Sequence, residues 1–208
     1  MGEITAITAQ KKDKTRCNIY IDGAFYCGLK IEVAVKNRLK TGQHVDPAAL
    51  SQMQFESEKA VALDKALTHI SVTMKTEKQI VDFLKGKGYV DEVVGYVVEK
   101  MKSYGYIDDE EYARQYVRSA GKSKGKRLLS LELERKGVKR EDAARAAEGA
   151  EGEEEAALAV LTKYMRHKEP TKENLQKAFR YLTGRGFGYE TVKDALRRYG
   201  ETDEDTGI

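Results

Sequence analysis

Apolar residues spaced four apart recur at three matching places along the chain. The later pair at each place is Val94 with Val98, Ala143 with Ala147, and Val192 with Leu196. The earlier pair is Leu63 with Leu67, Tyr112 with Tyr116, and Leu161 with Met165. Residues four apart lie on one face of an α-helix, so the pattern predicts amphipathic helices that return three times in the same register.

A short phrase, Leu-x-x-(Lys/Arg)-Gly, stands between the two apolar pairs of each place. Its three copies end at Gly88, Gly137 and Gly186, which are 49 residues apart each time. A glycine at a helix C-terminus typically takes a left-handed conformation, and a basic residue before it suits the negative helix end. One copy would be an ordinary helix terminator. Three copies at a fixed period predict tandem repeats, each with a helix, a second helix ending at the phrase, and a third helix.

The first part of the chain has a different pattern. Residues 3–9 alternate as a β-strand does, and the segment CNIYIDGAFYCGL predicts two strands joined by an Asp22-Gly23 turn. A two-residue turn pairs Ile19 with Tyr26 and places Cys17 and Cys27 on opposite faces. We therefore expect no disulfide between these cysteines. A short helix is expected over residues 31–39.

The predicted fold class is mainly α: an elongated tandem array of three three-helix repeats, with helix-turn-helix-like units, preceded by a small N-terminal β-hairpin/α region. The expected domains are 1–50 for the β-hairpin plus short helix, 51–107, 108–150 and 151–200 for repeats 1 to 3, and 201–208 for a frayed tail. Within the repeats, the predicted second and third helices cover 77–85 and 91–104, then a segment ending at 136 and 141–147, then 173–183 and 189–199.

The composition argues against a polybasic nucleic-acid binder and against a membrane protein. Charged residues make up 34% of the 208 residues, yet the net charge is only +3, so the chain as a whole is not a polybasic nucleic-acid binder. No apolar run approaches a membrane span and no signal peptide is evident, so we expect no membrane contact. Two cysteines in a chain of this length favour a cytoplasmic location.

No catalytic set is found in the sequence. His44, His69 and His167 fall in different regions without metal-ligand spacing, and no nucleophile is paired with a base. We expect no enzyme activity, no cofactor and no metal. Reading of DNA sequence by the third helices is disfavoured, because only the last of them, with Lys193, Arg197 and Arg198, carries groups suited to base edges.

Basic residues are the remaining candidates for a binding site. The middle repeat contains a flexible segment, residues 118–127, with five basic residues and no acidic one. Such a surface fits a phosphate backbone or an acidic protein, although a solvated loop and helix-dipole caps explain the same residues. The candidate basic surface comprises Arg114, Arg118, Lys122, Lys124, Lys126 and Arg127, and around the glycine phrases Lys85, Lys87, Arg135, Lys136, Arg180 and Arg185.

Several segments together resemble the RecX regulatory proteins of bacteria. They are YGYIDDEEYAR (residues 104–114), the basic loop before LSLELERKGV (129–138), and YLTGRGFGYETV (181–192). The resemblance covers about residues 56–200, and the N-terminal strands resemble an extension of longer members. Gly188 departs from the pattern, since a capping serine is common there. The lysine-rich loop also departs, because arginine is frequent there and lysine contacts are less bidentate.

This resemblance implies a non-enzymatic modulator of the RecA recombinase. A member of the family would lie along the groove of the RecA–DNA filament, lower its ATPase and strand exchange, and act in DNA recombination, DNA repair and the SOS response. The implied partners are the RecA filament and, weakly and without sequence preference, single- and double-stranded DNA, with the protein itself a monomer. Two alternatives are a sequence-independent DNA-binding protein that acts on nucleic acid directly and a purely structural helical scaffold.

Overall fold

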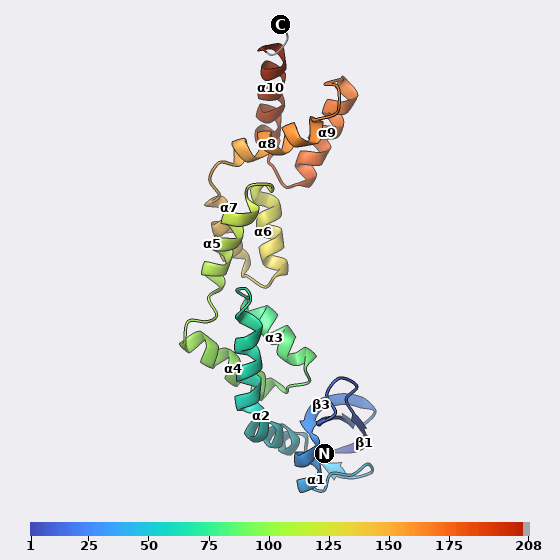
Figure 1. The fold of residues 1–208 in the computed structure, drawn as a ribbon. Helices are drawn as coiled ribbons and strands as arrows, with labels where there is room; N and C mark the ends of the chain where they lie inside the picture. Colours follow the sequence, from blue (N-terminus) through green and yellow to red (C-terminus); the bar gives the residue numbers. More distant parts are fainter. Residues whose placement is uncertain (206–208) are drawn as a thin grey trace. The chain divides into compact units, whose positions relative to one another are not determined.

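The structure is a computed structural model that describes residues 1–205, with side chains described through residue 201. It divides into two compact units, one spanning Met1–Asp108 and the other starting at Asp109. Ten helices and four strands lie within the described residues (Figure 1). The fold class is confirmed: the chain is mostly helical, with a small sheet at its N-terminus.

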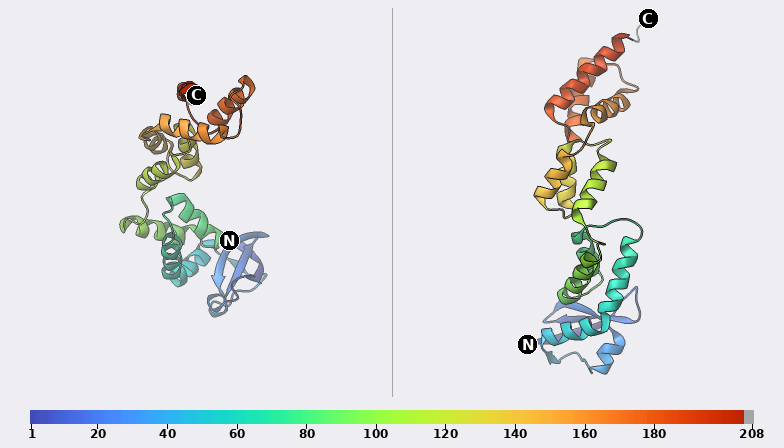
Figure 2. Two further views of the ribbon diagram at one scale, coloured as in Figure 1. Left: turned by 45° about the horizontal axis from the view of Figure 1, so that its top comes forward. Right: turned by 90° about the vertical axis from the view of Figure 1, so that its left-hand side faces the viewer.

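The first unit opens with a four-stranded antiparallel sheet. Its strands are β1 (Gly2–Ala9), β2 (Arg16–Ile21), β3 (Ala24–Lys30) and β4 (His44–Val45), in the order β3-β2-β1-β4. Helix α1 (Ile31–Lys36) follows β3 directly and is shorter than predicted. The sheet lies beside the N-terminal part of α2 (Figure 2).

The predicted hairpin turn is confirmed, but part of its register is wrong. Asp22 and Gly23 form the turn with φ of 50° and 84°, and Ile21 pairs with Ala24. Beyond Tyr20 the register shifts by one residue, so Ile19 pairs with Cys27 and not with Tyr26. A β-bulge of this kind adds one residue to one strand, and no turn rule predicts it.

The bulge corrects the predicted placement of the cysteines. Cys27 lies opposite Ile19, and Cys17 is two residues before Ile19 on the same strand face, so both thiols lie on the buried face of the sheet. Both cysteines are free, as expected, although the predicted reason was wrong. Burial raises the pKa of the Cys27 thiol to about 12, with the neighbouring Cys17 and Glu58 adding to the shift.

These buried thiols are expected to be unreactive in the native protein. A thiol with a pKa of about 12 is protonated at pH 8, and the thiolate is the reactive species. Iodoacetamide at pH 8 should therefore label Cys17 and Cys27 at a small fraction of the rate found after denaturation, as measured by mass spectrometry. Equal rates with and without denaturant would contradict the buried placement.

The first three-helix repeat completes this unit. Helices α2 (Pro47–Ile70), α3 (Glu77–Gly86) and α4 (Asp91–Ser103) pack on one another, with Ile80, Leu84, Val94 and Met101 in their core. Helix α2 is continuous from Pro47 to Ile70. Asp46 begins it by accepting a 3.0 Å hydrogen bond from the backbone N–H of Ala48.

The second unit holds the other two repeats. Repeat 2 comprises α5 (Asp109–Ala120), α6 (Lys126–Arg135) and α7 (Arg140–Glu148). Repeat 3 comprises α8 (Glu153–Met165), α9 (Lys172–Gly184) and α10 (Tyr189–Asp205). Helix α10 continues beyond its predicted end near residue 199, so residues 201–205 are helical where a frayed tail was predicted. Residues 206–208 of that tail lie outside the described part of the chain.

The glycines of the three phrases have the predicted left-handed conformation, with φ of 84° at Gly88, 101° at Gly137 and 86° at Gly186. Two of these turns also dock against another element of the same unit. The carbonyl of Gly88 accepts a 2.8 Å hydrogen bond from the N–H of Gly28 on β3. The carbonyls of Arg185 and Gly186 accept hydrogen bonds of 3.0 and 3.3 Å from Gly125 and Arg127, which begin α6. The phrase thus ends helices and, in two of its copies, also joins a repeat to a neighbouring element: the sheet at Gly88 and repeat 2 at Gly186.

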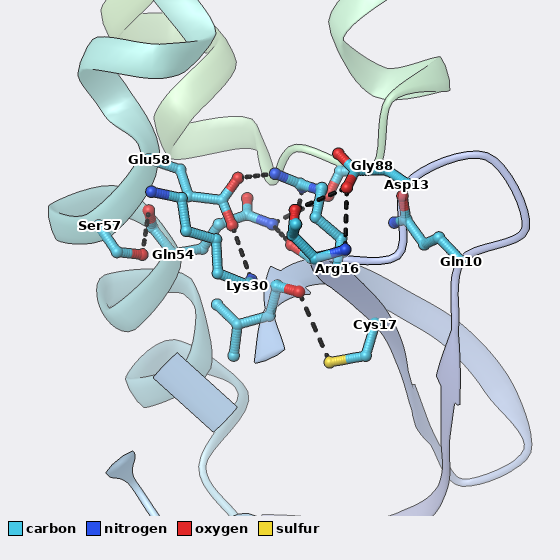
Figure 3. Close-up of polar contacts among 12 residues, drawn as sticks. Gln10, Asp13, Arg16, Cys17, Lys30, Gln54, Ser57, Glu58 and Gly88 are labelled. Carbon is cyan, nitrogen blue, oxygen red and sulfur yellow. Dashed lines mark hydrogen bonds and ion pairs between the residues drawn. The ribbon is translucent and has the colours of Figure 1, made fainter. Parts of the chain in front are cut away.

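A buried polar network fixes the sheet of the first unit to its helices (Figure 3). The Arg16 guanidinium on β2 forms an ion pair with Glu58 on α2, and their side chains are 4% and 0% exposed. The backbone N–H of Lys30 donates to the second Glu58 oxygen at 3.1 Å. The Gln54 side chain donates to the carbonyls of Gly28 and Gly88 and accepts from the N–H of Val90.

Candidate functional site

The structure divides the candidate basic residues by their partners. Lys124, from the loop between α5 and α6, is held inside repeat 2. Its ammonium lies 2.6 Å from the Glu132 carboxylate on α6 and donates to the Tyr116 hydroxyl at 3.3 Å. Burial alone would lower the pKa of Lys124, but these hydrogen bonds outweigh it and raise that pKa. Lys124 therefore serves the packing of its own repeat.

Four other candidates also have structural partners. Lys85 pairs with Asp91 at 2.9 Å, and Lys126 pairs with Glu148 at 3.2 Å. Arg114 pairs with Glu111 at 2.8 Å on its own helix. Arg185 lies over the Tyr181 ring, 5.0 Å from its centroid, beside the docking of repeat 3 on repeat 2. These contacts fit the capping and packing interpretation of the basic residues.

Lys136 is a further candidate with a contact inside repeat 2, because its ammonium lies 5.2 Å from the centroid of the Tyr116 ring. The remaining six candidates form no ion pair with a carboxylate of the described chain. They are Lys87, Arg118, Lys122, Arg127, Arg135 and Arg180. All six are exposed, so they are the candidates best placed to contact a partner. A single basic surface that includes all the candidates would join residues of both units and stays a prediction.

Two of these six residues lie on a groove of the second unit. The groove has a volume of about 830 Å³ and runs between α5, α7 and the Gly149–Gly152 linker that leads into α8. Arg118 and Lys122 stand on its α5 side, with Arg114 one turn earlier. The loop segment after Lys122 does not line it, so the structure separates the two halves of the predicted basic loop.

The groove is balanced in charge and has a small-residue floor. Four cationic side chains line it, Arg114, Arg118, Lys122 and Arg145, together with four carboxylates, Glu110, Asp142, Glu151 and Glu155. Val117, Ala146, Ala150 and Ala156 supply the apolar surface. A phosphate backbone would meet the carboxylates, so the groove suits a protein surface of mixed charge better than nucleic acid.

The sequence did not reveal the other side of this groove. Arg145, on α7, donates to Glu110 at 3.4 Å and pairs with Asp142. The acidic residues at helix starts are consistent with dipole compensation, and their spacing gives no sign that two such starts face one cavity. Among the described residues, no cluster of three or more His, Cys, Asp or Glu could hold a metal ion. No described helix is both long and apolar enough to span a membrane.

Comparison with known proteins agrees with this architecture domain by domain. Residues 2–46 match the model of the regulatory protein RecX N-terminal domain. Residues 62–101, 108–146 and 152–196 match the first, second and third three-helix domains of RecX. A regulatory protein RecX of Clostridium perfringens is 31% identical over 95% of this chain and 96% of its own length.

The chain belongs to the RecX family. A regulatory protein RecX of Bacillus subtilis is also 31% identical, over 99% of this chain and 81% of its own length. A solved structure described as a regulatory protein RecX is 30% identical, covers 93% of this chain and all of its own, and superposes with a TM-score of 0.60. The RecX structure from Lactobacillus salivarius is 21% identical over 67% of this chain, with a TM-score of 0.60, and shows the shared fold alone.

Proposed function

We propose that this chain is a non-enzymatic modulator of the RecA recombinase that binds along the RecA–DNA filament groove and lowers its ATPase and strand exchange. Membership of the RecX family supports the partner, since the relatives are named regulatory proteins. The charge-balanced groove of the second unit supports a contact with protein. A tandem array also suits a periodic filament, because weak contacts of successive repeats add through effective concentration.

The observation that carries the proposal is the separation of Arg118 and Lys122 from the other basic residues of the loop. Both are exposed, both line the groove, and neither is in an ion pair within the described chain. Lys124 and Lys126, by contrast, are paired with carboxylates, and the exposed Arg127 does not line the groove. We therefore assign the RecA contact to Arg118 and Lys122, with Val117 and Ala146 as the apolar floor beneath them.

Replacing Arg118 and Lys122 together by alanine is expected to weaken inhibition of RecA while leaving the fold intact. Loss of two interface cations that face a protein partner typically costs enough to raise the half-inhibitory concentration about tenfold. The measurement is the ATPase rate of RecA on single-stranded DNA, titrated with the variant. Circular dichroism should give the wild-type melting curve.

The matched control is the Lys163→Ala, Lys172→Ala double variant. It removes the same charge from exposed positions of the same unit that have no ion pair in the described chain. Wild-type inhibition by this control, with a weakened Arg118/Lys122 variant, is the expected outcome. Full inhibition by the Arg118/Lys122 variant at unchanged concentration would remove the groove from the mechanism.

The alternative function is direct, sequence-independent DNA binding. It predicts that inhibition follows the coating of bare DNA and falls steeply with salt, because phosphate contacts release counterions. Equal salt dependence of inhibition and of bare-DNA binding would favour this alternative over a filament contact.

A further inference from the structure

A second hollow lies in the first unit, far along the chain from the groove. Its volume is about 550 Å³, and it is formed by the C-terminal end of α2, the loop that follows, and the C-terminal half of α3. Eight residues line it: Lys65, Thr68, His69, Val72, Thr73, Lys75, Phe83 and Lys87. None of them is acidic, in contrast to the groove of the second unit with its four carboxylates.

Three lysines from three segments converge on this hollow. Lys65 comes from α2, Lys75 from the loop, and Lys87 from the end of α3. None forms an ion pair with a carboxylate of the described chain, and Lys65 and Lys75 are half-buried. The Lys65 ammonium also lies 5.9 Å from the centroid of the Tyr89 ring, and it helps to lower the pKa of Asp13, although hydrogen bonds from Thr15 cause most of that lowering. The side chains that line the hollow therefore carry an excess of positive charge.

The imidazole of His69 reports this local charge. Burial lowers the pKa of His69, and Lys75 and Lys87 lower it further. Both lysines therefore lie close enough to the His69 imidazole to disfavour its charged form. An anion held between Lys75 and Lys87 would offset the repulsion between their charges.

The wall beside the cations is aromatic and apolar. The rings of His69 and Phe83 are stacked, with centroids 4.0 Å apart and an interplanar angle of 2°. The Lys87 ammonium lies 5.5 Å from the centroid of the Phe83 ring. Val72 projects from the loop with 87% of its surface exposed. Cations next to a flat aromatic surface are the combination that binds single-stranded nucleic acid, because the cations contact phosphate and the rings contact bases.

We propose that this hollow binds single-stranded nucleic acid, with a phosphate held by Lys65, Lys75 and Lys87 and an adjacent base beside the stacked His69–Phe83 pair and Val72. An acidic peptide would satisfy the lysines but leave the aromatic wall without a matching group. A duplex keeps its bases stacked inside and would likewise leave the wall unused. The inference deepens the nucleic-acid part of the proposed function, and it needs no recombinase.

The test is binding of a fluorescein-labelled oligo(dT) to the full chain, followed by anisotropy at several salt concentrations. The Lys65→Ala, Lys75→Ala, Lys87→Ala variant should bind about tenfold more weakly. Its salt dependence should also be shallower, because each lost phosphate contact reduces the slope by about 0.7. A matched control replaces Lys36, Lys40 and Lys139, which are exposed lysines outside the hollow, and should keep nearly the wild-type affinity and slope.

Two competitors identify the ligand class. An oligonucleotide of abasic sites should compete about tenfold less well than oligo(dT), because it lacks the bases that meet the aromatic wall. Poly-glutamate of equal charge should compete poorly. Equal competition by poly-glutamate, or equal oligo(dT) affinity of the triple variant and its control, would overturn the assignment to nucleic acid.

The outcomes of these experiments distinguish failure of the nucleic-acid site from failure of the proposed function. Wild-type protein that binds no oligo(dT) at low salt but still inhibits the RecA ATPase would overturn the hollow as a nucleic-acid site and leave the RecA proposal standing. Wild-type protein that binds oligo(dT) through the three lysines without affecting RecA would do the reverse.

Discussion

Replacement of Glu58 by glutamine is expected to destabilise the first unit by about 3–5 kcal/mol, because it leaves the buried Arg16 guanidinium without a countercharge. The pair is almost completely removed from solvent, with side chains 4% and 0% exposed. The second Glu58 oxygen also accepts from the N–H of Lys30, so the same carboxylate ties β2, β3 and α2 together (Figure 3). Thermal unfolding monitored by circular dichroism measures the loss.

Two further variants test whether the unpaired buried charge causes the loss of stability. Arg16→Met combined with Glu58→Leu removes both charges, so it should recover much of the lost stability. Asp82→Asn breaks an exposed pair with Lys78 and should leave the unfolding midpoint nearly unchanged. An Arg16/Glu58 double variant as unstable as Glu58→Gln would mean that packing, and not the unpaired charge, dominates the effect.

Replacement of Gly186 by alanine is expected to release repeat 3 from repeat 2 at a cost of about 3 kcal/mol. An alanine Cβ there would lie 2.4 Å from the Leu128 backbone nitrogen, so the two segments must separate. The φ of 86° adds strain, since residues with a Cβ disfavour the left-handed region. The docking bonds from Gly125 and Arg127 would be lost with the contact.

Hydrogen exchange locates this effect. The amides of Gly125 and Arg127 should lose protection in the Gly186→Ala variant, while the first unit keeps its wild-type pattern. Gly184→Ala is the matched control, because a Cβ at Gly184 meets nothing within 4 Å, and it should be neutral or slightly stabilising. Wild-type protection at Gly125 in the Gly186→Ala variant would contradict the docking role of the glycine phrase.

The helices could be predicted well because their signals are local. The period of the glycine phrase and the apolar spacing place the helices of all three repeats within a few residues, and Leu84, Leu133 and Leu182 of the phrases are fully buried. The β-bulge after Tyr20 was missed because no turn rule predicts the extra residue in β3. The end of α10 was placed too early, since its polar residues resemble a tail.

The candidate site could be predicted only in part. The basic loop is evident from its residues, but the sequence does not distinguish Lys124, which pairs with Glu132, from Lys122, which is exposed. Glu132 lies on the next helix, and the pairing appears only when α5 and α6 pack. The lysine-lined hollow was missed for a similar reason. Lys65, Lys75 and Lys87 are spread over two helices and a loop, and their spacing along the chain carries no motif.

The most direct test of the central claim compares two concentrations for the wild-type protein. One is the concentration that half-inhibits the RecA ATPase on single-stranded DNA, and the other half-saturates the same DNA without RecA. If the filament is the target, we expect the half-inhibiting concentration to be at least about tenfold lower than the concentration that half-saturates bare DNA. The inhibition should also depend less on salt than bare-DNA binding does. Inhibition that coincides with DNA saturation at both salt concentrations, or no inhibition at all, would contradict a RecA-directed modulator.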